Sequence, residues 1–513
     1  MNGADSLLAT LAAAGVDVCF ANPGTSEMHF MAALGQQRAM RGVLGLFEGV
    51  VSGMADGYGR LAGKPAVTLL HLGPGLSNAS ANLHNARRAG TPIVNVVGDH
   101  ATGHLRFDAP LASDIVGLAR PVSHWVHTTT SSRNVAADAA RAVQAAQQPP
   151  GQIATLILPA DAAWEPAGGP SAPLPVPVPV PVGDDAVGRV ADVLRSGRRV
   201  ALLLRGDCLR GDGLVAAGRV RAATGARLLC DTFAPRTERG AGRVRIEKLP
   251  YFAEQLVTAL SEVDVLVLVG SKPPVSFFAY PDKPSWGLRD DADIVTLAHP
   301  HEDATAALQA LADVVGAPAE PAGVAEWNPP TMSNGPLNQF TLGEVIGHFL
   351  PEGSIISEEA ATNSLGPFAG TLNAAPHDYL ALTGGSIGQA VPVAAGAAVA
   401  CPDRKVVCLQ GDGGAMYTLQ TLWTMAREQL DVTTVIFANR AYGILRVELD
   451  RVGAVPSEAT LSMFDLRRPD LDWVKLAEGM GVEAVAVDSV GAFADAFASA
   501  MAARGPRLIE VVM

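Results

Sequence analysis

The hydrophobic pattern of the chain alternates between short continuous apolar runs and segments with helical spacing. The apolar runs end in glycine or polar turns, and the clearest are 66–70, 200–204, 265–269, 433–438 and 508–512. Strands buried on both faces of a parallel sheet have this appearance, and such strands alternate with helices. We therefore expect an α/β fold built from doubly wound parallel sheets.

Two stretches rich in proline and glycine interrupt this pattern. In the first, AGGPSAPLPVPVPVPVGDD, proline alternates with apolar residues, so the segment is extended and cannot join the centre of a sheet. We expect both stretches to be linkers, at 167–185 and 316–337. The predicted domains are then 1–166, 186–315 and 338–513.

Composition agrees with a large enzyme whose sheets are buried. The 513 residues exceed what one core supports, and 48% are hydrophobic while only 17% are charged. These values also favour a large subunit interface. The net charge of −13 argues against nucleic acid as a partner.

The cysteines and the N-terminus favour the cytoplasm. The first twenty residues lack a basic flank and are interrupted by Gly15 and Asp17, so they do not form a secretory signal. No uninterrupted apolar run reaches membrane-spanning length, and no Cys/His cluster has zinc spacing. The odd number and scattered positions of the cysteines predict free thiols in a reducing compartment: Cys19, Cys208, Cys230, Cys401 and Cys408.

The segment from Val406 to Gly443 carries the clearest candidate chemistry. An apolar run meets the turn Gly411-Asp412-Gly413-Gly414, a helical pattern follows, and a second apolar run ends at Asn439. Both strand ends would lie on one edge of a parallel sheet, where open α/β folds bind ligands. The helix start offers N–H groups to a diphosphate, and Asp412 and Asn439 offer oxygen atoms to a hard cation. A purely structural glycine turn is the alternative.

The spacing of these residues resembles the diphosphate motif of thiamine diphosphate (ThDP) enzymes. Asn439 follows Asp412 by 27 residues, although Arg440 stands where the family has a second asparagine. The resemblance implies that ThDP binds with Mg²⁺, which Asp412, Asn439 and the backbone carbonyl of Ala441 would hold. It further implies cofactor contacts from Gly411, Gly413, Gly414 and Tyr442.

Two other segments resemble the same family. LGLFEGVVSGMADGYGRLAGKPAV is similar to its pyrimidine-binding domain, where the residue matching Glu48 bonds the aminopyrimidine and helps to activate the cofactor. LTGGSIG is similar to its Gly-Gly turn, which implies that Ile387 supports the bent cofactor and that the Gly385 carbonyl accepts from its amine. A dinucleotide loop is the competing interpretation, but the Gly-x-Gly-x-x-Gly order is missing.

The order of the segments resembles the acetolactate synthase and benzoylformate decarboxylase branch of ThDP enzymes. The resemblance implies three domains, which bind the pyrimidine, form the middle and bind the diphosphate. It also implies a homodimer or homotetramer with active sites at the interface. Several acetolactate synthases hold FAD in the middle domain, but this chain is short and lacks a dinucleotide fingerprint there, so we expect no FAD.

Three further residues are candidates for catalysis. Thr25, in Phe-Ala-Asn-Pro-Gly-Thr, matches the active-site serine of benzoylformate decarboxylase, and a helix N-cap is its alternative role. His71 ends an apolar run and matches a histidine that relays protons in decarboxylases. His100 stands where acetolactate synthase has valine, and simple exposure is its alternative.

Substrate choice depends on departures from these relatives. Leu111 replaces a synthase glutamine that faces the cofactor, and Val447-Glu448 replaces Trp-Phe of benzoylformate decarboxylase. The stretch 275–280 lacks the second decarboxylase histidine. We therefore expect a small aliphatic 2-oxo acid such as pyruvate, with an aromatic 2-oxo acid as the alternative.

Two other functions remain open. A ThDP-binding paralogue with little catalysis and an interaction or regulatory role is favoured by Leu111 and by the missing histidine. The family residues at Glu48, Asp412, Asn439 and His71 oppose it. A nicotinamide or flavin oxidoreductase built on the same sheets finds no fingerprint of its own.

Overall fold

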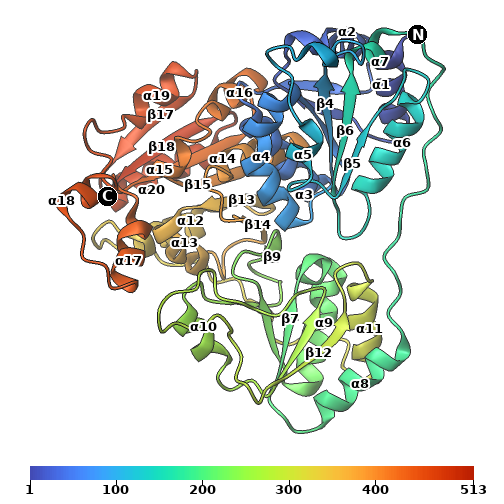
Figure 1. Cartoon of the computed structure of the whole chain (residues 1–513). Helices are drawn as coiled ribbons and strands as arrows, with labels where there is room; N and C mark the ends of the chain where they lie inside the picture. Colours follow the sequence, from blue (N-terminus) through green and yellow to red (C-terminus); the bar gives the residue numbers. More distant parts are fainter.

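The computed structural model describes residues 1–513 and contains three sheets with helices on their faces (Figure 1). The strands pair in parallel except for one antiparallel pair, so the predicted α/β fold is confirmed. None of the helices combines the length and the apolar character that a membrane crossing requires.

The first sheet has the strand order β2-β1-β3-β4-β6-β5. Its strands are β1 (Val18–Ala21), β2 (Arg41–Leu44), β3 (Ala66–Leu70), β4 (Ile93–Asp99), β5 (Trp125–Thr128) and β6 (Ile153–Pro159). Its helices are α1 (Gly3–Ala13), α2 (Met28–Gln36), α3 (Glu48–Ala62), α4 (Leu72–Ala89), α5 (Ile115–Ala119), α6 (Val135–Ala146) and α7 (Ala160–Trp164), with 3₁₀ turns η1 (Thr25–Glu27) and η2 (Leu105–Phe107).

The second sheet has the order β10-β8-β7-β11-β12. Its strands are β7 (Val200–Leu204), β8 (Arg227–Cys230), β10 (Glu247–Lys248), β11 (Val265–Val269) and β12 (Asp293–Ala298). Its helices are α8 (Asp184–Arg195), α9 (Gly211–Thr224), α10 (Ala253–Leu260) and α11 (Ala304–Val314), with the turn η3 (Gly206–Leu209).

The third sheet has the order β17-β18-β16-β15-β13-β14-β9. Its strands are β9 (Thr237–Arg239), β13 (Ser354–Glu359), β14 (His377–Ala381), β15 (Val406–Gly411), β16 (Val432–Ala438), β17 (Glu483–Val487) and β18 (Arg507–Val512). Its helices are α12 (Gln339–Phe349), α13 (Leu365–Gly370), α14 (Ala390–Ala400), α15 (Asp412–Ala415), α16 (Thr421–Glu428), α17 (Gly443–Arg451), α18 (Glu458–Ser462), α19 (Trp473–Gly479) and α20 (Val490–Ala502), with the turn η4 (Ala361–Asn363).

The strand orders place a switch point in the first and in the third sheet. In the first, β2 and β3 lie on opposite sides of β1, and in the third, β14 and β15 lie on opposite sides of β13. The connections leave such a point in opposite directions, which opens a crevice at the carboxyl ends of the strands. The motifs that follow β1, β3 and β15 therefore lie where this architecture binds ligands.

The first and third units share one hydrophobic core, which includes Phe20, Met54, Val393 and Ile436. Helices α3 and α14 cross at close range because glycines face backbone atoms there. A Cβ on Gly57 would lie 2.0 Å from the Val393 carbonyl oxygen, and one on Gly396 would lie 1.9 Å from that of Met54. This crossing fixes the start of α3 relative to the third sheet.

One strand of the middle segment joins the third sheet. Strand β9 leaves it and pairs antiparallel with β14 at the edge of the third sheet. Figure 1 shows the second sheet below the other two, with β9 reaching toward them. The two proline-rich stretches carry no regular strand, but each touches the middle unit through a β-bridge, Val180 with Glu302 and Val324 with Val244.

Candidate active site

The carboxyl ends of β15 and β16 bring Asp412 and Asn439 to one edge of the third sheet. The Asp412 side chain is 3% exposed, and its two oxygens accept from the backbone N–H groups of Gly413 (2.8 Å) and Arg440 (2.7 Å). The Asn439 Oδ1 atom accepts from Ala441 N at 3.1 Å. Burial raises the pKa of Asp412, and a bound cation would act in the opposite direction.

The glycines around Asp412 form a cradle that side chains would fill. A Cβ on Gly413 would lie 2.4 Å from the Tyr442 ring, and one on Gly414 would lie 2.6 Å from the side chains of Glu359 and Gln410. No group of three His, Cys, Asp or Glu side chains could hold a metal ion by itself. Asp412, Asn439 and a backbone carbonyl nevertheless form the oxygen-donor set that Mg²⁺ accepts when a phosphate completes its shell. These residues therefore fit a metal-bound diphosphate.

Glu359 fixes the loop that precedes α14. Its buried carboxyl accepts from the backbone N–H groups of Gly388 (2.7 Å), Gln389 (2.7 Å) and Ala390 (3.0 Å), and from Gln410 Nε2 (2.9 Å). Burial raises its pKa against the lowering effect of these donors. Sequence reasoning missed Glu359, because a glutamate at a strand end has no distinctive local signal.

The Gly-Gly turn lies between α4 and the middle unit. Asn85 donates to the Ser386 carbonyl at 2.7 Å, and the His84 Nε2 atom lies 3.1 Å from the Gly384 carbonyl. His84 therefore makes a polar contact with this turn. Gly385 has a φ of 78°, and a Cβ there would lie 2.6 Å from the Phe277 ring. The next apolar residue, Ile387, is half-buried.

Glu48 begins helix α3 and is 6% exposed. Its Oε2 atom accepts from Asn78 Nδ2 at 3.0 Å, and no protein group donates to Oε1. A Cβ on Gly75 would lie 3.4 Å from this Oε1 and 3.3 Å from the Cβ of His71, so Glu48 and His71 flank the same glycine. The buried carboxyl thus has one oxygen available for a ligand.

His71 forms a pair with a glutamate that the sequence did not identify. Its Nδ1 atom lies 2.9 Å from Glu27 Oε2 and 3.3 Å from the Ser26 hydroxyl, and the Glu27 side chain is only 2% exposed. Gly24 makes this contact possible, because a Cβ there would lie 2.0 Å from the imidazole. Leu72 follows His71 with a φ of 47°, which is strained for a leucine.

The switch point of the first sheet explains this pair. Gly24 and Glu27 follow β1, whereas His71 follows β3, and the two strands are neighbours in the sheet. Thr25 is exposed at the start of η1, where Glu27 bonds the Gly24 N–H, so neither Thr25 nor Ser26 acts as the N-cap. The only signal for Glu27 in the sequence was its position three residues after Gly24.

His100 and Leu111, which the sequence also singled out, follow strand β4 of this unit. His100 follows β4, is half-buried, and its ring centroid lies 5.4 Å from that of His104. Its Nε2 atom is buried without a hydrogen-bond partner. Leu111 is 36% exposed in an irregular segment. No hydrogen bond joins either residue to the His71–Glu27 pair.

Aromatic side chains from the middle unit gather beside the Gly-Gly turn. The Phe277 ring lies 5.7 Å from Phe233, 5.2 Å from Tyr251 and 4.8 Å from Phe278, measured between centroids. Together with Glu448 of α17, several of these residues line one pocket. The stretch 275–280 therefore contributes aromatic rings and no histidine to this place.

No hydrogen bond or ion pair joins the Glu48–His71 group to the Asp412–Asn439 group within the chain. The two groups occupy the switch points of different sheets. In the first group, Glu48 Oε1 has no protein donor and His71 is paired with Glu27, whereas in the second group the Asp412 and Asn439 oxygens accept from backbone N–H groups.

Comparison with known proteins agrees with this geometry. Residues 1–151 match the family model for the N-terminal TPP binding domain of thiamine pyrophosphate enzymes, and residues 369–511 match the model for the C-terminal TPP binding domain. Thiamine pyrophosphate is another name for ThDP. The matched ranges contain both groups of site residues.

Similar proteins span the whole chain. It is 53% identical over 515 residues to a Mycobacterium tuberculosis protein named "Putative acetolactate synthase large subunit IlvX". The alignment covers 100% of this chain and 99% of that protein. The chain is 29% identical over 520 residues to benzoylformate decarboxylase of Pseudomonas aeruginosa, with 97% and 96% covered. Its fold matches the ThDP-dependent 4-hydroxybenzoylformate decarboxylase of Rhodococcus jostii RHA1 with a TM-score of 0.86, 24% identity, and 100% and 99% covered. The chain therefore belongs to the ThDP-dependent enzyme family that includes acetolactate synthase and benzoylformate decarboxylase.

Proposed function

We propose that the protein uses ThDP and Mg²⁺ to decarboxylate a 2-oxo acid and then either protonates the remaining fragment or joins it to a second carbonyl compound. The observation that carries this proposal is the His71–Glu27 pair, which lies beside the available oxygen of Glu48. A ThDP-binding paralogue without catalysis would have no need of a proton-transfer pair at this position. The sequence identity to proteins named acetolactate synthase and benzoylformate decarboxylase supports the same reaction class.

The cofactor sites follow from the residues that fit them. Asp412, Asn439 and the carbonyl of Ala441 would hold Mg²⁺, and Gly411, Gly413, Gly414 and Tyr442 would surround the diphosphate. Glu48 would bond the pyrimidine, Ile387 would support the cofactor, and the Gly385 carbonyl would accept a hydrogen bond from its amine. ThDP would supply an electron sink for the carbon that loses CO₂.

The chain itself would manage protons and orientation. An ionised Glu27 can only accept hydrogen bonds, so it keeps the proton of His71 on Nδ1 and leaves Nε2 free to take or give a proton. Thr25 and Ser26 offer hydroxyl groups to the substrate carboxylate. His100 is a second candidate for proton transfer.

We propose that two copies complete each site, as a homodimer or a homotetramer. No hydrogen bond or ion pair joins the Glu48–His71 group to the Asp412–Asn439 group within one chain. A second copy would bring the first group of one chain to the second group of the other. The matches of the chain to both binding domains are consistent with this arrangement. A cytoplasmic location is supported by the five free cysteines, and no FAD is expected.

Two kinds of 2-oxo acid are candidates for the donor substrate. Val447 and Glu448 in place of larger aromatic residues support a small aliphatic donor such as pyruvate. The rings of Phe277, Tyr251 and Phe233 beside Gly385 support an aromatic 2-oxo acid as a second candidate. Both candidates use the same cofactor sites.

The first test is turnover of the purified protein with pyruvate and with benzoylformate, measured as CO₂ release and product identity. We expect product with one donor and its loss when ThDP or Mg²⁺ is withheld. Glu48→Gln should remove most of the activity while leaving ThDP bound, because the diphosphate and metal contacts are untouched. Wild-type turnover in Glu48→Gln would contradict the role of Glu48, and no turnover of any 2-oxo acid despite ThDP binding would contradict the reaction.

A further inference from the structure

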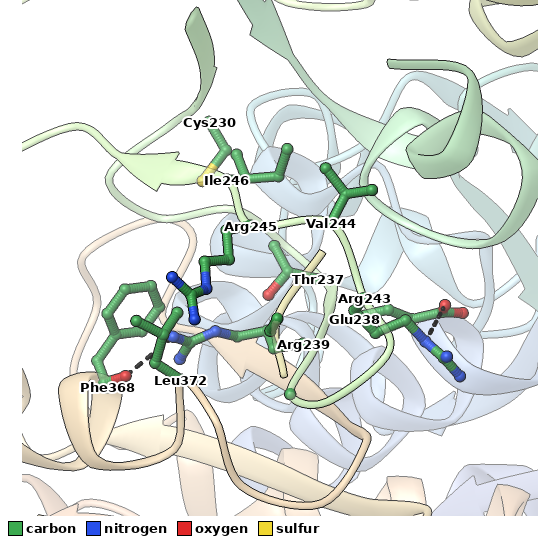
Figure 2. Close-up of a pocket in the computed structure, with 12 residues that line it drawn as sticks. Cys230, Thr237, Glu238, Arg239, Arg243, Val244, Arg245, Ile246, Phe368 and Leu372 are labelled. Atoms are coloured by element: carbon green, nitrogen blue, oxygen red, sulfur yellow. Dashed lines mark hydrogen bonds and ion pairs between the residues drawn. The ribbon is translucent and has the colours of Figure 1, made fainter. Parts of the chain in front are cut away.

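A separate pocket lies between the middle unit and the third sheet (Figure 2). Its empty volume is about 370 Å³, part of which is open to solvent. It is lined on one side by strand β9 and the segment after it, and on the other by Phe368 of α13 and by Leu372, which follows this helix. None of the residues assigned to the ThDP site lines it.

Cationic side chains gather around Phe368, which lines this pocket; Arg239 and Arg245 line it too, and Lys248 lies beside it. The Arg239 guanidinium lies 3.5 Å from the centre of the Phe368 ring, and the Lys248 ammonium lies 4.7 Å from it. Arg245 donates to Asn373 Oδ1 at 2.8 Å, just beyond the end of the same helix. Figure 2 shows the guanidinium groups of Arg239 and Arg245 on the side of the pocket that Phe368 and Leu372 form.

None of these three cations forms an ion pair. Arg239 donates to neutral oxygens only, those of Thr371 (3.3 Å) and of the Phe368 carbonyl (2.9 Å). The single carboxylate that lines the pocket, Glu238, is bound to Arg243 at 3.3 Å and to a backbone N–H group. Three cations therefore converge without a counter-ion in a chain whose net charge is −13.

The burial of Arg239 makes its positive charge unfavourable in free energy. Arg239 is 8% exposed, and burial lowers its pKa to about 10, so desolvation opposes its charge. Tyr379, Cys230 and His377 lie close to it, and none of these groups is a carboxylate. A buried charge that lacks a partner is unfavourable unless a ligand supplies one.

We propose that this pocket is a binding site for a small oxyanion, the phosphate or carboxylate group of a metabolite. Arg239 and Arg245 supply planar forks that match two oxygens of such a group, and Lys248 adds a point charge. The Phe368 ring forms an apolar wall beside them. Because the site shares no residue with the ThDP site, the proposal is independent of the donor that the enzyme uses.

The test is calorimetric titration of the full-length protein, saturated with ThDP and Mg²⁺ so that the diphosphate cradle is filled. The probes are inorganic phosphate and malonate, each compared with chloride at equal ionic strength. We expect saturable binding of at least one probe, and the two probes distinguish a phosphate site from a carboxylate site. Arg245→Gln and Lys248→Gln change side chains that are exposed or half-buried, so both variants should fold.

Arg245→Gln should weaken the affinity by about tenfold or more, because a hydrogen bond to a charged group is lost. Lys248→Gln should weaken it by about threefold or more. The matched control is Arg219→Gln, whose side chain pairs with Asp313 outside the pocket. Absence of saturable binding of both probes would overturn the proposal. So would an affinity that is the same in Arg245→Gln, Lys248→Gln and the wild type.

Discussion

At the scale of single residues, the positions that matter most are held by partners far away in the sequence. His71 depends on Glu27, which lies 44 residues before it and is buried against Gly24 and Gly98. A Cβ on Gly98 would lie 2.0 Å from Glu27 Oε1, so the carboxyl packs closely against the backbone of Gly98. The pair is therefore preorganised before any ligand binds.

Replacement of Glu27 by Gln should lower kcat by about 10- to 100-fold with little change in ThDP affinity. The amide can donate to Nδ1 as well as accept from it, so it no longer fixes the proton on Nδ1. Steady-state kinetics on the donor, together with a ThDP titration, would measure this effect. Glu428→Gln, at a surface pair with Arg41, is the control. An unchanged kcat would show that the pair has a structural role only.

At the scale of elements, the crossing of α3 and α14 holds the first-sheet site in a fixed position relative to the third sheet. Helix α3 begins at Glu48, and α14 begins at the loop that Glu359 holds. Close contact at Gly57 and Gly396 leaves no room for a side chain between the helices. The geometry of both ligand-facing loops therefore depends on two glycines that face backbone carbonyls.

Gly57→Ala should destabilise the protein by about 1 to 3 kcal/mol, because the added methyl group forces the helices apart. We also expect reduced activity, since Glu48 lies on the displaced helix. Gly188→Ala in α8 is the matched control, because no atom lies within 4 Å of its added Cβ and alanine favours a helix. Thermal unfolding would separate the two variants. Equal melting temperatures would contradict the close crossing.

At the scale of the whole molecule, β9 attaches the middle unit to the third sheet. Arg239 of β9 pairs with His377 of β14 in the antiparallel register, and both side chains are buried. A second attachment is the buried ion pair of Asp56 with Arg60, which also donates to the Pro235 and Ala381 carbonyls. These contacts therefore join all three units close to the proposed sites.

This attachment predicts an acid sensitivity. Burial and the charge of Arg239 lower the pKa of His377 from 6.5 to about 3, so unfolding takes up a proton between these values. The contribution of neutral His377 to the free energy of unfolding is fully present above pH 6.5. It is lost as the pH falls, by about 1.4 kcal/mol per pH unit. The stability difference between wild type and His377→Phe should therefore shift in favour of the variant as the pH is lowered.

Melting temperatures at about pH 7.5 and about pH 5 would measure this shift. His348→Phe is the control, because His348 is exposed and bonds only the Pro330 carbonyl. A pH dependence that is the same in wild type and in both variants would mean that His377 does not titrate as its burial requires.

The sequence predicted the parts whose physics is local. Continuous apolar runs such as Val265–Val269 became buried parallel strands, and the turn at Asp412 became a helix start at a strand end. The helical pattern after this turn proved to be two short helices, α15 and α16. The aromatic cluster around Phe277 was not predicted, because its rings come from separate loops of the middle unit.

The sequence alone determined the α/β class and the family, because glycines and oxygen ligands at fixed spacing are what a diphosphate and a metal ion require of one strand, one helix and the next strand. The tertiary structure alone decided which distant residues meet. Strand order brought the end of β1 to the end of β3, and thereby Glu27 to His71. It also placed β9 in another unit's sheet and three cations around Phe368. Such meetings depend on the long-range order of strands, which no local pattern of residues encodes.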